Sequence, residues 1–168
     1  MSADSITTAL FLITAVVASA VLINAIYPVI SNMAGTFSST THETDVRIRT
    51  DFKIIATYAS QSTGTAQVWM KNTGGEPIAL LDIQRADVFG GPTGNFEHFV
   101  HTSGSPGDNQ WTETFTSPEY DLNGNHYWDS GETVKITLKT TIPSTGNKVY
   151  FQFAIGSGIW RSTEFTVS

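Results

Sequence analysis

The sequence predicts an α + all-β protein, in which a single long N-terminal hydrophobic helix is followed by an antiparallel Ig-like β-sandwich. Two observations lead to this fold class. The stretch from Ile6 to Ile30 carries no charged residue, whereas the chain beyond residue 43 consists of short alternating runs separated by turn residues. The length of 168 residues suits one domain with one appended segment. We therefore predict a helix over residues 1–34, a linker over 35–42 and a β-sandwich over 43–168.

The helix is predicted from the apolar stretch itself. Because an α-helix rises about 1.5 Å per residue, roughly 20 residues cross a hydrocarbon core of about 30 Å, so residues 6–30 are long enough to span a membrane. A cleaved secretory signal would have a positive N-terminal region and an apolar run of about 7–15 residues. The region MSADS has no basic residue and the apolar run is longer. We predict that the helix is retained, with cleavage near Ala18 as the alternative.

The predicted helix has no polar face, so either lipid or copies of the same helix must surround it. Ala15 with Ser19, and Ala18 with Leu22, lie one helical turn apart, and small residues at this spacing favour close helix packing in lipid. The alternative is that alanine is simply common in apolar helices. Asp4 suits the positive end of the helix dipole in the first turn. We predict that these five residues serve helix self-packing or membrane contact.

The rest of the chain predicts a linker and a set of strands. The segment GTFSSTTH, residues 35–42, is small and polar and is expected to be flexible. Alternating apolar and polar residues then predict about seven to nine strands, and no useful helical period follows residue 42. These strands are expected at 46–55, 66–70, 78–89 (one or two strands), 96–100, 111–115, 134–138, 149–155 and 159–167.

The composition excludes several functions. The chain has 9 basic and 15 acidic residues, and its net charge of −6 does not suit nucleic-acid binding. It has no cysteine, which rules out disulfides, thiolate zinc sites and a cysteine nucleophile. No nucleophile elbow, phosphate-binding glycine loop or HExxH motif occurs, so we predict no enzyme activity and no organic cofactor.

One segment has the ligand spacing of a calcium loop. In DLNGNHYWDSGE, residues 121–132, side-chain oxygens fall at loop positions 1, 3, 5, 9 and 12, and position 7 can offer a backbone carbonyl. The predicted calcium ligands are Asp121, Asn123, Asn125, Tyr127, Asp129 and Glu132. His126 stands at position 6, where the EF-hand motif has glycine for its sharp turn, and the flanks look like strands. The alternative is a plain Asn-Gly turn with capping carboxylates.

Four segments resemble a known family. The apolar helix is similar to that of archaellins and type IV pilin-like proteins. The segments VWMKNTGGEPIALLDI (68–83), FGGPTGNF (89–96) and WDSGETVKITL (128–138) resemble the archaellum accessory proteins F and G. Archaellin and pilin precursors carry a short basic leader that ends in glycine, but no Lys, Arg or Gly precedes Ile6. This difference indicates either a mature chain or a member of the unprocessed accessory class.

The resemblance implies a structural component of the archaellum, the motility machinery of archaea. We expect a membrane-anchored stator or envelope-anchoring protein on the extracellular side of the cell envelope. The alternatives are an archaellin- or pilin-like filament subunit, whose helices form the filament core, and an unrelated membrane-anchored binding module. The expected partners are the membrane or like helices through residues 4–34, and a surface-layer protein or other archaellum proteins through the β domain. We also expect a homo-oligomer, with calcium as the only cofactor.

Overall fold

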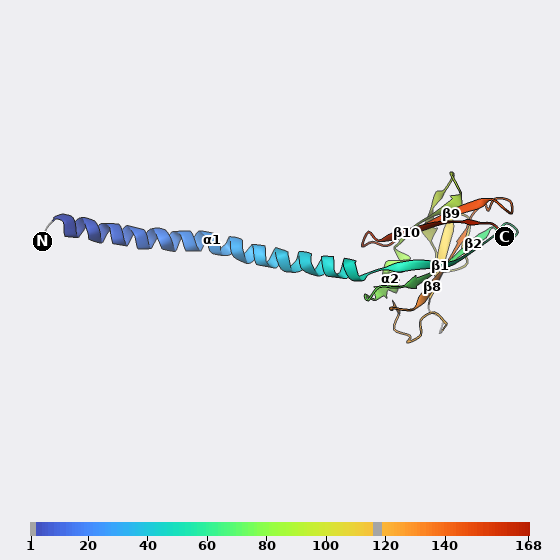
Figure 1. Ribbon diagram of the computed structural model, residues 1–168, viewed down its shortest axis with the longest axis horizontal. Helices are drawn as coiled ribbons and strands as arrows, with labels where there is room; N and C mark the ends of the chain where they lie inside the picture. Colours follow the sequence, from blue (N-terminus) through green and yellow to red (C-terminus); the bar gives the residue numbers. More distant parts are fainter. Residues whose placement is uncertain (1–2, 116–118) are drawn as a thin grey trace. The chain divides into compact units, whose positions relative to one another are not determined.

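The computed structural model describes residues 3–115 and 119–168, and its first element is the long helix α1 (Ala3–Arg49; Figure 1). The predicted long N-terminal helix is therefore confirmed, and Pro28 lies inside it. The chain divides into two compact units, Met1–Asp45 and Val46–Ser168. All the strands belong to the second unit, which we call the β unit.

The predicted linker over residues 35–42 is wrong, because α1 continues through it, and residues 46–49 are helical rather than extended. Threonine hydroxyls in this part of the chain bond back to the carbonyl four residues earlier, which keeps them satisfied in a helix. Such bonds run from Thr36 to Asn32 (3.0 Å), Thr41 to Phe37 (2.7 Å), Thr44 to Thr40 (2.7 Å) and Thr50 to Val46 (2.7 Å). Arg47 and Arg49 in the last turn also complement the negative end of the helix dipole.

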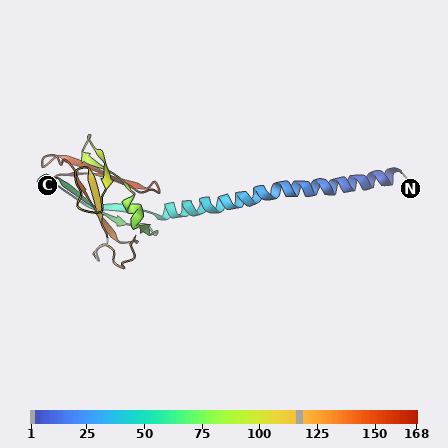
Figure 2. The same cartoon turned by 180° about the vertical axis from the view of Figure 1, so that it is seen from behind.

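The β unit is a two-layer sandwich. Its eight strands are hydrogen-bonded to their neighbours in the order β1-β2-β8-β6-β5-β4-β9-β10. Figures 1 and 2 both show β9 and β10 in one layer and β2 and β8 in the other. The eight strands are β1 (Phe52–Ser60), β2 (Thr65–Asn72), β4 (Asp87–Pro92), β5 (Glu97–His101), β6 (Gln110–Thr114), β8 (Thr133–Lys139), β9 (Lys148–Ala154) and β10 (Trp160–Thr166). The predicted sandwich is confirmed. One pair, β5 with β6, departs from the antiparallel prediction because it is parallel over two residue pairs.

The core lies between the two layers, where the predicted alternation places it. Val134, Ile136 and Leu138 of β8 are fully buried, while the intervening residues point outward. Aromatic rings join the layers: Phe153 packs edge-on against Phe52 (5.6 Å between centroids) and against Trp111 (6.2 Å). Edge-to-face pairs of this kind stabilise a core beyond the apolar area that they bury.

The stretch 78–89 differs from the prediction of one or two strands. It forms the short strand β3 (Ile78–Ala79), the helix α2 (Leu80–Gln84) and the start of β4. Strand β3 pairs with β7 (Tyr127–Trp128) in a separate two-stranded sheet. A helix of five residues is too short to show a helical period in the sequence. Burial of Ile83 in the core stabilises α2, since helices this short are not stable alone.

Candidate functional site

The apolar segment of α1 is the main candidate site for assembly. In the single chain, the large apolar side chains of this segment are exposed to solvent, with exposed fractions from 43% for Ile26 to 74% for Phe11. By length and composition, α1 is the one helix among the described residues that could cross a membrane. A contiguous apolar surface of this size on a protein marks contact with lipid or with another protein.

The residues predicted for helix packing lie on one side of α1. Ala15, Ala18, Ser19 and Leu22 follow the spacing i, i+3, i+4, i+7, which aligns them on a single helical face. The Ser19 hydroxyl donates to the carbonyl of Ala15 (2.8 Å), so it needs no partner outside the helix. Asp4 lies in the first turn, as predicted. Contact of this face with lipid or with a second helix stays a prediction.

The last turn of α1 is held inside the β unit by the turn that follows β2. The carbonyl of Arg49 accepts hydrogen bonds from the backbone amides of Gly75 (2.8 Å) and Glu76 (3.3 Å). The carbonyl of Asp51 accepts a further bond from Gly74 (2.8 Å). Backbone amides from a distant turn therefore satisfy carbonyls that a helix end otherwise leaves unpaired.

Asn72 fixes the shape of this turn. Its buried side-chain amide donates to the carbonyls of Trp128 (2.7 Å) and Glu76 (3.0 Å), and its side-chain oxygen accepts from the amide of Gly74 (2.9 Å). Gly74 has no room for a side chain, because a Cβ atom there would lie 2.3 Å from the carbonyl oxygen of Arg49. Sequence analysis missed the contact between this turn and the end of α1, because the two segments are more than twenty positions apart.

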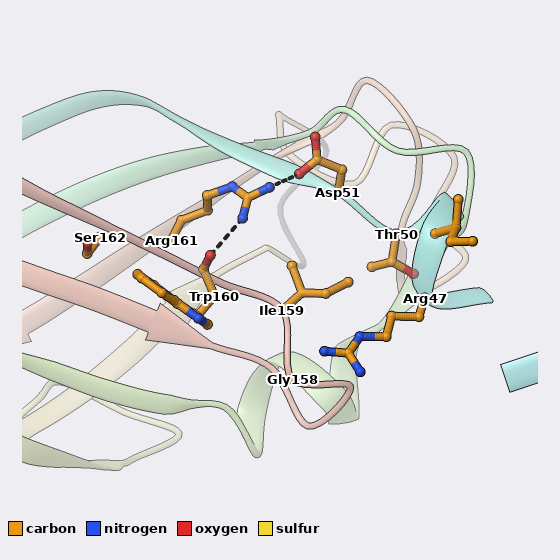
Figure 3. Close-up of a pocket in the computed structure, with 9 residues that line it drawn as sticks. Arg47, Thr50, Asp51, Gly158, Ile159, Trp160, Arg161 and Ser162 are labelled. Atoms are coloured by element: carbon orange, nitrogen blue, oxygen red, sulfur yellow. Dashed lines mark hydrogen bonds and ion pairs between the residues drawn. The ribbon is translucent and has the colours of Figure 1, made fainter. Parts of the chain in front are cut away.

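A groove of about 810 Å³ lies beside this junction within the β unit (Figure 3). The Arg161 guanidinium donates to the carboxylate of Asp51 and to the carbonyl of Trp160 (2.8 Å), and Figure 3 shows both contacts. The Trp160 side chain is about half exposed, and the exposed Arg47 side chain also lines the groove. Sequence analysis missed this groove, because no local motif connects residues that are more than a hundred positions apart.

The predicted calcium ligands do come together in one loop. Asp121 and Glu132 are each only 5% exposed, and their carboxylates accept backbone N–H bonds from within the loop. These bonds come from Gly124 (2.7 Å) and His126 (3.1 Å) to Asp121, and from Leu122 (2.8 Å) and Asp129 (2.9 Å) to Glu132. His126 has a φ of 62°, the left-handed conformation for which the EF-hand uses glycine, so the sharp turn forms without glycine.

The remaining predicted ligands are engaged with one another. The Asp129 carboxylate accepts from the side-chain amides of Asn123 (2.7 Å) and Asn125 (2.8 Å). The side-chain oxygen of Asn125 accepts from the backbone amide of Tyr127 (2.8 Å). Among the described residues, no three His, Cys, Asp or Glu side chains are grouped so that they could hold a metal ion. Calcium binding by this loop therefore stays a prediction.

Calcium is expected to raise the melting temperature of the full chain. With a Kd of about 1 mM, calcium at about 5 mM would stabilise the β unit by about 1 kcal/mol, which is a shift of several degrees. The measurement is thermal unfolding by circular dichroism, with calcium replaced by magnesium as the first control. The variant Asp129→Asn should lose the shift. Equal melting temperatures with and without calcium would exclude the prediction.

The comparisons with known proteins agree with this fold. The sequence profile of the archaeal-type flagellin family matches residues 2–165. The chain is similar to an uncharacterized protein of Archaeoglobus fulgidus, at 28% identity over 141 residues, which are 83% of this chain and 82% of that protein.

Two solved structures show the same fold. The archaellum periplasmic stator protein FlaG from Sulfolobus acidocaldarius matches with a TM-score of 0.53 and 23% identity, over 69% of this chain and 99% of that chain. The archaeal flagellum of Methanospirillum hungatei strain JF1 matches with a TM-score of 0.68 and 17% identity, over 97% of this chain and 93% of that chain.

Proposed function

Because the chain belongs to the archaeal-type flagellin family and is a structural component of the archaellum, we propose that it is a membrane-anchored stator or envelope-anchoring protein. In this role α1 is inserted in the membrane, and the β unit works on the extracellular side of the envelope. The observation that carries the proposal is the uncharged segment 6–30, which is long enough to span a bilayer and exposes its large apolar side chains within the chain.

The β unit supports this role through its construction. A stator must resist torque, so it needs an anchor and a domain that does not deform. The two packed layers of strands and the hydrogen-bonded turn 72–75, which holds the last turn of α1, support such a domain. Its partners in this role are other archaellum proteins, and the surface-layer protein is the proposed attachment point in the envelope.

A filament subunit is the second candidate. The observation that favours it is the match to the archaeal flagellum structure over 97% of this chain, which includes α1. In a filament the apolar segments of many copies would cover one another in place of lipid, and the face with Ala15 and Ala18 would allow close packing. The family match argues against the unrelated binding module.

Immunogold labelling tests the proposal. An antibody against residues 46–168 is applied to whole cells and to filaments sheared from them. The stator proposal predicts label confined to the cell envelope and clean filaments. Label along the full length of detached filaments would reject the stator and establish the filament subunit, and a preparation from cells that lack the protein is the control for specificity.

A further inference from the structure

The outward face of the sheet β1-β2-β8-β6 is unusually basic for this acidic chain. Strand register and alternating burial place the side chains of four lysines on this face, which we call the lysine face: Lys53, Lys71, Lys135 and Lys139. The outward positions of these four strands carry no Asp or Glu. The rest of the chain has 5 basic and 15 acidic residues, so its formal charge is 5 − 15 = −10.

The lysines have few ion-pair partners. Within residues 3–115 and 119–168, only Lys139 lies near a carboxylate, that of the highly exposed Asp108 at 3.9 Å. Trp69 and Tyr58 stand among the lysines on adjacent strands, and Tyr58 is 45% exposed. Aromatic side chains are enriched at protein interfaces, and the rims of interfaces are polar.

A second surface of the β unit has the opposite character. A groove of about 340 Å³, which we call the acidic groove, is lined by elements β3, α2 and β7, the end of α1 and the turn after β9. Its charged lining residues are Glu76 and Asp82, and no basic residue lines it. Its lining residue Tyr127 and the neighbouring Leu81 are each about half exposed. Neither carboxylate forms an ion pair with another described residue.

We propose that the lysine face of one copy docks on the acidic groove of the next copy. The two surfaces are complementary in charge, and each offers exposed apolar side chains that an interface can bury. Because they are different patches of one chain, the contact is heterologous and repeats from copy to copy. The inference deepens the proposed function and rests on it: the contact would join the β units of neighbouring copies outside the membrane.

The absence of cysteine makes this contact measurable by crosslinking. Full-length Lys71→Cys and Asp82→Cys variants in detergent are mixed and treated with a bismaleimide. The expected product is the mixed dimer that joins residues 71 and 82, in several-fold excess over dimers from either variant alone. The yield should fall several-fold at high salt, because screening weakens exposed charge pairs.

Lys148→Cys is the matched control. Lys148 is an exposed lysine of the other layer, 3.8 Å from Glu164, and its crosslinking to Asp82→Cys measures the background from contacts through α1. A yield for Lys71→Cys no higher than this background would overturn the proposal. Binding of Lys71→Cys protein to phosphatidylglycerol vesicles through the lysine face, without the mixed dimer, would assign the face to lipid instead.

Charge reversal gives an independent test. One double variant, Lys71→Glu with Lys135→Glu, loses the lysine face. The other, Glu76→Lys with Asp82→Lys, loses the acidic groove. Each variant alone should associate no more than the background that contacts through α1 produce. A mixture of the two variants pairs the native lysine face of one with the native acidic groove of the other, and the reversed surfaces also carry opposite charges, so association should return in the mixture. Unchanged association in both variants would reject the contact. These measurements use purified protein, so they are independent of the labelling experiment on cells.

Discussion

Replacing Gly74 by alanine is expected to lower the free energy of unfolding of the β unit by more than about 3 kcal/mol. The added Cβ would lie 2.3 Å from the carbonyl oxygen of Arg49 and 2.5 Å from the amide nitrogen of Asp51, far inside van der Waals contact. Both atoms belong to the backbone, and neither can move away without breaking the hydrogen bonds that join the turn to the end of α1.

The measurement is thermal unfolding of the full chain by circular dichroism, where such a loss corresponds to a drop of about 10 °C for a unit of this size. Gly104→Ala is the matched control, because a Cβ at Gly104 meets nothing within 4 Å and the backbone there is not left-handed. It should change the free energy of unfolding by less than about 0.5 kcal/mol. Similar melting temperatures for the two variants would show that the turn is not tightly fitted.

Two charges in the middle of the apolar segment are expected to abolish assembly. In the double variant Ala18→Arg with Leu22→Arg, each arginine costs about 2.5–3.5 kcal/mol at the centre of a membrane helix, so the pair costs roughly 5–7 kcal/mol. A helix bundle would reject the same charges, because they would be buried without partners. The expected result is loss of the protein from carbonate-washed membranes and from filaments, together with loss of motility.

The control places the same pair of charges farther along α1. Ser38→Arg with His42→Arg has the same spacing of four residues but lies beyond the apolar segment, on an exposed polar part of the helix. It should leave membrane association and motility unchanged. If the variant with arginines at positions 18 and 22 remains in membranes and supports motility, then α1 is neither a membrane anchor nor a buried assembly helix.

Some features of this protein follow from local patterns in the chain. The absence of charge from Ile6 to Ile30 predicts an apolar helix, because a single apolar stretch of this length satisfies its backbone hydrogen bonds in lipid as a helix. The alternation from Val134 to Leu138 predicts a strand with one buried face, since side chains of a strand alternate between its sides. The spacing in residues 121–132 predicts that their oxygens gather in one loop, because a tight turn brings alternate residues together.

The polar segment 35–42 has a composition that suits either a loop or a solvated helix, and hydroxyl-to-carbonyl hydrogen bonds within α1 accompany its helical conformation. Another feature depends on tertiary contacts. The short helix α2 forms where Ile83 can enter the core.

Composition and short-range periodicity were enough to predict the apolar helix, most of the strands and the family resemblance. The tertiary structure alone decided that Gly74 meets the end of α1 and that the lysines of β1, β2 and β8 share one face. The physical reason is that strand register and sheet order join residues far apart in the chain, and no local period specifies which strands become neighbours.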